Sequence, residues 1–111
     1  MTHISRKDFE NVGLRVGRIT KAEVFPEAWN PSFKGWVDFG EFGAKKSSAQ
    51  LTSLYPKESL LNRQVISVTN FKTKQIANFM SEVLITGFYD ADGSVVLAKP
   101  DKNVPYGTLL A

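Results

Sequence analysis

The chain has 111 residues, of which 42% are hydrophobic and 23% charged, and its formal net charge is +3. This length fits one domain, so we expect residues 1–111 to form a single globular unit. The chain has no cysteine, and its single histidine, His3, lies at the N-terminus. These counts exclude a disulfide framework and a thiolate metal site, and they argue against a histidine-based catalytic or metal site. We therefore expect no metal and no cofactor.

The sequence shows neither a membrane-spanning segment nor a signal peptide. No apolar run reaches the ~18–20 residues that a membrane span needs, and the first residues have no signal-peptide pattern. The sequence therefore predicts a cytoplasmic protein without membrane insertion. The charge of +3 permits nucleic-acid contact, but a dedicated phosphate-backbone binder usually carries a denser basic stripe. The charge alone leaves the kind of partner open.

The first elements in chain order are a short helix and a long strand. Ser5 and Asp8 have the spacing of a capping box, which predicts a helix that ends before Gly13. The residues from Leu14 to Phe25 alternate as a strand, with Gly17 at the point where the hydrophobic parity changes. A strand glycine there indicates a bulge or a sharp bend, and a bent first strand allows a small sheet to close into a barrel.

Further short strands follow, separated by turns and by a short helical segment over 51–55. A hairpin turn is expected at Asp90-Ala91-Asp92-Gly93, which only superficially resembles a calcium loop because its glycine comes two residues too early. This pattern predicts a mainly all-β fold, a five-stranded Greek-key barrel of the OB type with short helices. The predicted strands after the first cover 33–39, 44–51, 64–71, 82–89 and 94–98, with a possible last strand at 108–110.

The acidic residues of the chain are scattered rather than paired. Without a usable histidine, a metal signature or an activated nucleophile, acid–base and nucleophilic chemistry have no residues to carry them. The sequence therefore predicts a binding module and not an enzyme.

The third predicted strand is unusually polar. It contains Lys45-Lys46-Ser47-Ser48-Ala49-Gln50, and two further polar stretches follow at Val68-Thr69-Asn70-Phe71 and Phe79-Met80-Ser81-Glu82-Val83-Leu84. Each stretch places short hydrogen-bonding side chains on an ordered backbone. This pattern is typical of a surface against which a ligand lies.

The aromatic residues are divided between the core and the surface. Trp29 follows a proline-containing loop, and Trp36 shares its strand parity with Lys34, so both are candidates for stacking on a base or gripping an apolar side chain. They could equally cover the barrel mouth or a subunit interface. Basic pairs beside the polar strands are either solvated surface or phosphate contacts. We expect Phe33, Phe39, Phe71, Phe79 and Phe88 in the core.

Several motifs carry a resemblance that covers nearly the whole chain. They include Arg15-Val16-Gly17, Asp38-Phe39-Gly40, Ser47-Ser48-Ala49-Gln50 and Ser81-Glu82-Val83-Leu84. Together they resemble the CsaA-type secretion chaperones, a branch of the tRNA-binding-domain family that also includes C-terminal domains of methionyl-tRNA synthetases. The first two motifs are typical of the whole family, and the last two are typical of the CsaA branch.

The resemblance implies an OB-fold with terminal elements that form a homodimer, binding unfolded or exported polypeptide, with tRNA binding as the ancestral activity. It places the tRNA contacts of the family on Lys34, Ser81 and Leu84. In two places the chain departs from its relatives: Glu82-Val83 replaces Gln-Gly, and Trp29-Asn30 replaces Arg-Lys. Both changes reduce the attraction for phosphate, so the sequence favours polypeptide.

The leading hypothesis is therefore an export-related chaperone that binds unfolded or preprotein polypeptide as a homodimer. The alternative is a structure-directed tRNA-binding protein, and a third possibility is a structural domain that tethers to a synthetase or a ribosomal component. The predicted peptide-binding residues are Phe33, Trp36, Ser48, Gln50, Asn70, Phe79, Ser81 and Leu84. The predicted tRNA-binding residues are Lys34, Lys45, Lys46, Lys72, Lys74 and Ser81. For the dimer interface the candidates are Tyr106, Leu109 and Leu110, which could instead cap their own barrel.

Overall fold

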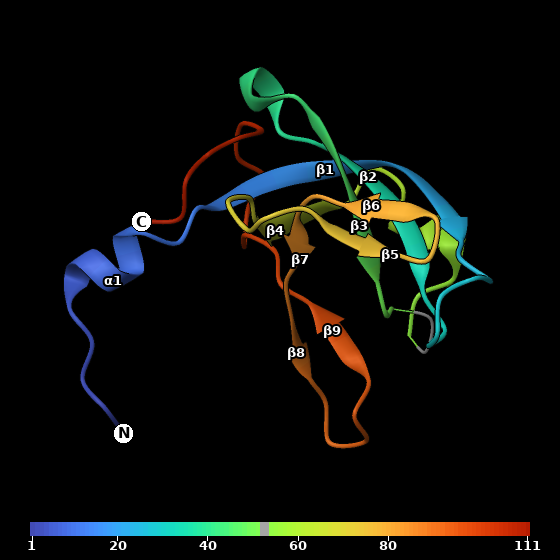
Figure 1. Cartoon of the computed structure of the whole chain (residues 1–111). Coiled ribbons are helices and arrows are strands. Elements are labelled where there is room, and N and C mark those ends of the chain that lie inside the picture. The colour runs from blue at the N-terminus through green and yellow to red at the C-terminus, as the bar shows by residue number, and fades with distance from the viewer. Residues whose placement is uncertain (52–53) are drawn as a thin grey trace.

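The computed structural model describes residues 1–51 and 54–111. Its main element is a five-stranded antiparallel sheet with the strand order β3-β2-β1-β4-β7, which curls into a nearly closed barrel (Figure 1). This arrangement confirms the predicted all-β fold of the OB type. The five strands are β1 (Leu14–Val24), β2 (Phe33–Asp38), β3 (Ala44–Ala49), β4 (Gln64–Val68) and β7 (Leu84–Ile85).

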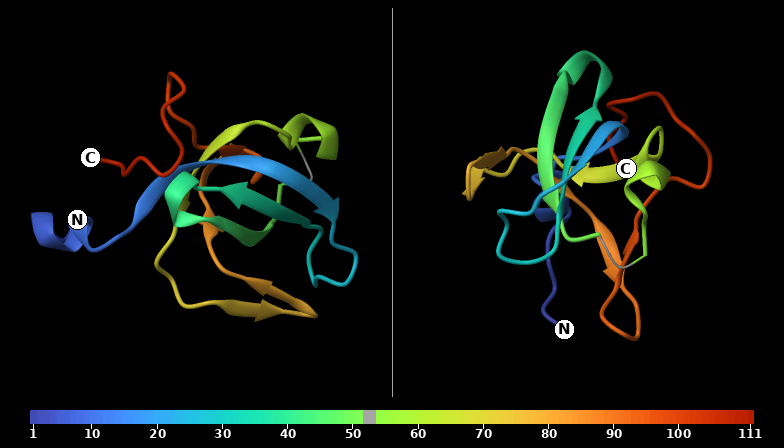
Figure 2. Two further views of the ribbon diagram at one scale, coloured as in Figure 1. Left: turned by 90° about the horizontal axis from the view of Figure 1, so that it is seen from above. Right: turned by 90° about the vertical axis from the view of Figure 1, so that its right-hand side faces the viewer.

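Shorter elements surround the barrel. The strands β5 (Lys74–Ile76) and β6 (Phe79–Ser81) form one hairpin, and β8 (Gly87–Tyr89) and β9 (Val95–Leu97) form another. The helix α1 (Arg6–Glu10) projects from the barrel on the side where the C-terminus also lies (Figures 1 and 2). Two 3-10 turns cover Gly40–Phe42 and Lys57–Leu60. The helix expected over 51–55 includes residues 52 and 53, which lie outside the described residues.

Strand β1 is long enough to pair with two neighbours, β4 along its first half and β2 along its second half. Its register with β2 shifts between Ile19 and Lys21, so the bulge lies at that point, and the predicted bulge at Gly17 is wrong. Gly17 is needed for close packing instead. A Cβ there would lie 2.5 Å from Val37 Cγ1 and 2.7 Å from Phe39 Cε1. The bulge bends β1 and allows it to pair with β4 and β2 on the two sides of the barrel.

The hydrophobic core fills the barrel and contains Phe33, as the sequence predicts. The prediction that Phe71 and Phe88 belong to this core is wrong, because they are 59% and 66% exposed. Phe71 comes after the end of β4, and Phe88 lies on the hairpin that projects beyond the barrel. The least exposed apolar residues of the core are Ile19, Val37, Phe39, Leu60 and Val65.

Two predicted strands are shorter in the structure than the sequence suggests. The strand expected over 64–71 ends at Val68, where Thr69 turns to the N-terminal segment and its N–H and hydroxyl both donate to the Gly13 carbonyl. The strand expected over 82–89 divides at Thr86. The N–H of Thr86 donates to Ile66 in β4, whereas its carbonyl accepts from Ala98 next to β9. The chain therefore changes sheets at Thr86.

The C-terminal segment runs along the first half of β1. Gly107 N–H donates to the Val16 carbonyl, Val16 N–H donates to the Thr108 carbonyl, and Leu110 N–H donates to Leu14. The possible strand over 108–110 is thus reduced to a single bridge between Arg15 and Leu109.

The close approach at Gly17 generates a stability prediction. We expect Gly17→Ala to lower the free energy of unfolding by about 1–3 kcal/mol, because the new methyl group must displace two fully buried side chains. Gly35→Ala is the matched control, since its Cβ would meet Ile85 Cδ1 at an ordinary 3.7 Å. Urea denaturation of both variants measures the difference. Equal losses in the two variants would contradict this account of Gly17.

Candidate binding groove

The backbone groups on the outer edge of β3 form hydrogen bonds with side chains as well as with backbone. Lys46 N–H donates to Glu82 Oε1 at 3.1 Å, and Ser48 N–H donates to Ser81 Oγ at 3.1 Å. The N–H groups of Glu82 and Val83 both donate to the Lys46 carbonyl, at 2.8 and 3.3 Å. These four bonds close the barrel between β3 and the segment that leads into β7. Ser81 and Glu82 therefore hold β3 in place.

An open pocket of about 560 Å³ lies next to this closure. It brings together five residues that the sequence predicts as ligand contacts: Ser48, Lys72, Lys74, Ser81 and Leu84. Four further residues line it, and three of them are apolar. These additional residues are Phe71, Ile76, Glu82 and Val83.

A second hollow of about 680 Å³ continues from the pocket, because Ser48 and Leu84 line both. Gln50, another predicted contact, lies in this hollow with residues of the β8–β9 hairpin. We call the pocket and the hollow together the β3 groove. Their volumes are in the range of typical ligand sites. The β3 groove thus contains four of the eight predicted peptide-binding residues: Ser48, Gln50, Ser81 and Leu84.

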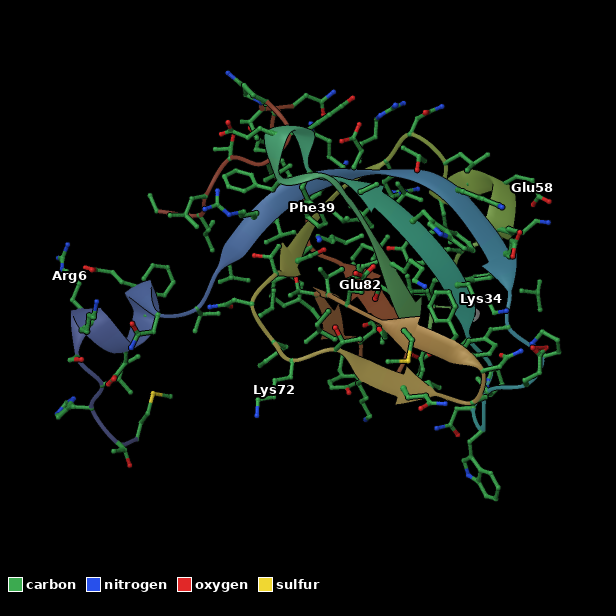
Figure 3. All side chains as sticks on the ribbon, turned by 45° about the horizontal axis from the view of Figure 1, so that its top comes forward. Arg6, Lys34, Phe39, Glu58, Lys72 and Glu82 are labelled. Carbon is green, nitrogen blue, oxygen red and sulfur yellow. The ribbon has the colours of Figure 1, made fainter. Side chains whose placement is uncertain are left out.

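A different set of predicted residues meets on the outer face of β2. The ring of Phe79 packs edge-on against Trp36, with ring centroids 5.9 Å apart, and against Phe25 at 5.5 Å. The Nζ atoms of Lys34 and Lys46 lie 5.5 and 5.2 Å from the centre of the Phe79 ring. Figure 3 shows Lys34 at the end of β2, close to the β5–β6 hairpin. This basic aromatic face adjoins the β3 groove, because Lys34 lies opposite Ser48 in the pairing of β2 with β3.

Two predicted apolar contacts are too buried to meet a ligand. Phe33 is 6% exposed inside the barrel core, and Phe79 is 6% exposed on the side of the β5–β6 hairpin that packs against Trp36. Their assignment as peptide contacts is therefore corrected, since both rings are used in packing. Trp36 is half-buried, with the Lys21 ammonium 4.8 Å from its ring centre.

Asn70 also has a structural task. Its Oδ1 accepts from Gly13 N–H at 2.8 Å, and its Nδ2 donates to the Asn11 carbonyl at 2.8 Å. These bonds tie the segment behind α1 to the end of β4, so Asn70 is not among the residues of the β3 groove. Lys45 of β3 lies opposite Val37 of β2. Because neighbouring residues of a strand point to opposite faces, Lys45 points away from Lys46 and from the basic aromatic face.

The β5–β6 hairpin is the element that sequence analysis missed. Its turn uses Ala77 at φ 52°, a left-handed conformation for which glycine or asparagine would be the usual sign. The neighbouring Asn78 was the one signal that could have indicated the turn. The hairpin carries Phe79 on its buried side and supplies Ile76 and Ser81 to the pocket.

In the β8–β9 turn, the Ser94 backbone N–H donates to the Asp92 carboxylate and lowers its pKa. Within residues 1–51 and 54–111 no cluster of acidic or histidine side chains could hold a metal ion. No helix in the described part of the chain is long and apolar enough to cross a membrane.

Residues 14–109 match the model of the tRNA binding domain, a stretch that contains the barrel, both hairpins and the whole β3 groove. The chain belongs to this tRNA-binding-domain family. The family and its fold indicate a binding domain rather than a catalytic one.

Among solved structures, the domain is similar to chaperone CsaA from Bacillus anthracis, with 42% identity, a TM-score of 0.93 and coverage of 99% of this chain and 100% of that one. It is also similar to the CsaA chaperone protein from Picrophilus torridus, with 44% identity, a TM-score of 0.91 and coverage of 98% and 100%. These likenesses confirm the resemblance to the CsaA branch of the tRNA-binding-domain family.

Curated relatives include methionine–tRNA ligases. The domain is 29% identical over 97% of its length to the ligase of Methanocaldococcus jannaschii, and 32% identical over 96% to that of Pyrococcus horikoshii. It covers 16% and 14% of these two enzymes. The likeness therefore concerns a small part of each ligase.

The closure of the barrel generates the second prediction. We expect Glu82→Ala to lower the free energy of unfolding by about 1–3 kcal/mol, because the Lys46 N–H loses its acceptor in a half-buried place. Glu82→Gln keeps an oxygen at the same position and should retain most of the stability. Denaturation curves measure the stability, and amide exchange at Lys46 reports the bond itself. Slow exchange at Lys46 in the alanine variant would refute the role given to Glu82.

Proposed function

We propose that this domain is an export-related chaperone module that binds unfolded or preprotein polypeptide in the β3 groove and acts as a homodimer. The observation that carries the proposal is the composition of the groove next to the barrel closure. Exposed apolar side chains, Phe71 and Leu84, lie beside the hydroxyls of Ser48 and Ser81 in one pocket. Apolar contacts and short polar groups together suit an extended peptide of varied sequence.

The pocket has three charged lining residues. Lys72 precedes the β5–β6 hairpin and Lys74 is its first residue, whereas Glu82 uses Oε1 to hold the Lys46 N–H. Figure 3 shows Lys72 pointing away from the barrel. The lysines can therefore steer acidic segments toward the groove, whereas Leu84 and Phe71 provide the apolar contact. The likeness to CsaA chaperones over the full length of the chain supports this choice.

The alternative is tRNA binding, and one observation favours it. Lys21, Lys34 and Lys46 all lie on the outer face of the sheet within about 5–6 Å of an aromatic ring. Two of these three have a carboxylate nearby, since Glu23 Oε1 lies 3.1 Å from Lys21 Nζ and Glu27 Oε2 lies 3.9 Å from Lys34 Nζ. Ammonium groups beside aromatic rings are a common means of holding single-stranded nucleic acid. The description of the matched family also names tRNA.

We infer a homodimer from the two chain ends. Helix α1 has five residues and buries none of them, yet so short a helix is marginal on its own in water. Phe9 and Val12 are exposed there, and Leu109 and Leu110 are exposed on the adjacent C-terminal segment (Figure 2). A second copy that packs against both ends would cover these side chains.

The homodimer is tested by mass. Light scattering at micromolar concentration should give twice the chain mass of 12.4 kDa, and Leu109→Asp should give the monomer because it places a charge in the proposed interface. Leu61→Asp is the matched control, since Leu61 is a similarly exposed leucine on a different part of the surface. A monomeric wild-type protein would overturn the homodimer.

Peptide binding is tested by titrating a fluorescent unfolded peptide. We expect saturable binding, and we expect Leu84→Ser to weaken it by about 1–2 kcal/mol, roughly tenfold in Kd, because the exposed leucine in the groove is lost. Leu61→Ser removes an equally exposed leucine elsewhere and should leave the Kd unchanged.

Two further measurements separate the two functions. Absence of saturable binding by the folded wild-type protein would exclude the chaperone proposal. Retardation of bulk tRNA that falls steeply with salt, and that is weakened by Lys46→Ala but not by the control Leu61→Ser, would establish the alternative.

A further inference from the structure

The β8–β9 hairpin has one strand edge that pairs with no other strand in the described part of the chain. Asp90 N–H donates to the Ser94 carbonyl at 2.7 Å, and Ala98 N–H donates to the Thr86 carbonyl at 3.2 Å. In an antiparallel pair, hydrogen-bonded residues alternate with residues that face outward. These two bonds therefore assign Thr86, Phe88 and Asp90 to the side of β8 that faces β9.

Gly87 and Tyr89 accordingly direct their backbone N–H and carbonyl groups away from β9. Leu97, which lies opposite Gly87, donates its N–H to the Tyr55 hydroxyl at 3.0 Å, as expected where a pair exchanges no hydrogen bonds. No backbone partner for Gly87 or Tyr89 is found within the described residues. An unpaired edge of this kind is a template for an additional strand.

This free edge borders the 680 Å³ hollow of the β3 groove, which Gly87 and Tyr89 both line. The described side chains around the hollow include no charged group. A phosphate backbone therefore finds no cationic partner in it, and the nearby Lys72 and Lys74 belong to the adjoining pocket. The polar side chains that line the hollow are amides and hydroxyls: Asn30, Ser48, Gln50, Thr86, Tyr89 and Ser94.

We propose that an extended, uncharged segment of polypeptide adds as a strand to the free edge of β8 and forms backbone hydrogen bonds with Gly87 and Tyr89. This inference rests on the proposed function and adds the binding mode and the substrate class. Backbone pairing is independent of sequence, whereas a neutral hollow with aromatic and apolar walls selects for uncharged side chains. Ser48 and Leu84 lie at the border with the pocket, so the same segment can continue toward Lys72 and Lys74.

Tyr89→Pro is the most direct variant, because it removes one outward N–H. That N–H takes no part in the bonds to β9, and edge strands accept proline where the N–H faces outward. Tyr89→Ala is the matched control, which removes the same side chain and keeps the N–H. Gly87 is unsuitable for this purpose, since a Cβ there would lie 2.6 Å from the Val96 carbonyl oxygen.

The experiment titrates a fluorescent, uncharged unfolded peptide into the wild type and both variants. We expect Tyr89→Pro to bind about tenfold more weakly than Tyr89→Ala, with matching circular dichroism spectra. A peptide N-methylated at alternate residues should bind the wild type at least tenfold more weakly than the parent peptide. If the proline variant does not fold, the comparison of the N-methylated peptide with its parent tests strand addition without it.

The experiment distinguishes a failure of the proposed function from a failure of strand addition. If the wild type binds no peptide, the proposed function itself fails. If it binds, but proline and alanine variants have the same Kd and N-methylation has no effect, strand addition to β8 is refuted while the proposed function stands. Loss of the dimer in Tyr89→Pro alone, or displacement of the peptide by an oligothymidylate, would assign the edge to a second copy or to nucleic acid and overturn the inference.

Discussion

The N–H and carbonyl groups on the outer edge of β3 need hydrogen-bond partners before the sheet can close into a barrel. The groups that act as these partners determine how the surrounding surface is formed. In a fully paired barrel a neighbouring strand would bind every N–H and carbonyl of β3 that faces away from β2. Here the side chains of Ser81 and Glu82 accept the N–H groups of Ser48 and Lys46 in its place. Side-chain acceptors satisfy the edge at two points without a continuous ladder. The segment between β4 and β7 is therefore free to leave the barrel and form the β5–β6 hairpin.

The hairpin has two consequences for binding. Its inner side buries Phe79 against Trp36 and Phe25, which stabilises the outer face of β2 and brings lysines close to the aromatic rings. Its other side, with the segment that precedes β7, forms the wall of the β3 groove. One irregular segment thus lies between a basic aromatic face and the β3 groove, whose hollow has no charged lining residue. The two surfaces share β3, where Lys46 lies on the aromatic face and Ser48 in the groove.

The long first strand has a comparable role at the other end of the molecule. Its bulge between Ile19 and Lys21 allows it to pair with β4 and β2 in turn, and its first half also receives the C-terminal segment. That segment and helix α1 then lie on the same side of the barrel with their apolar residues exposed (Figures 1 and 2). The barrel is thus complete by itself, while the two chain ends retain a surface that suits a partner.

The sequence by itself determined the features that depend on neighbours along the chain. The capping box of Ser5 and Asp8 is local, and both of its hydrogen bonds are present. Alternation of apolar residues placed β1 and β2, and the number of short predicted strands was enough to predict a small all-β barrel. The motifs around Ser48 and Ser81 also identified the branch of the tRNA-binding-domain family before the fold was known.

The tertiary structure decided what depends on residues far apart in sequence. Ser81 looks like a ligand contact in isolation, and only the closure across more than thirty positions shows that it and Glu82 hold β3. Asn70 likewise anchors the N-terminal segment, and Phe71 and Phe88 are exposed because their strands end early or leave the barrel. A local pattern specifies which side chains can form hydrogen bonds or seek burial. It does not specify their partners, because these are set by the path of the whole chain.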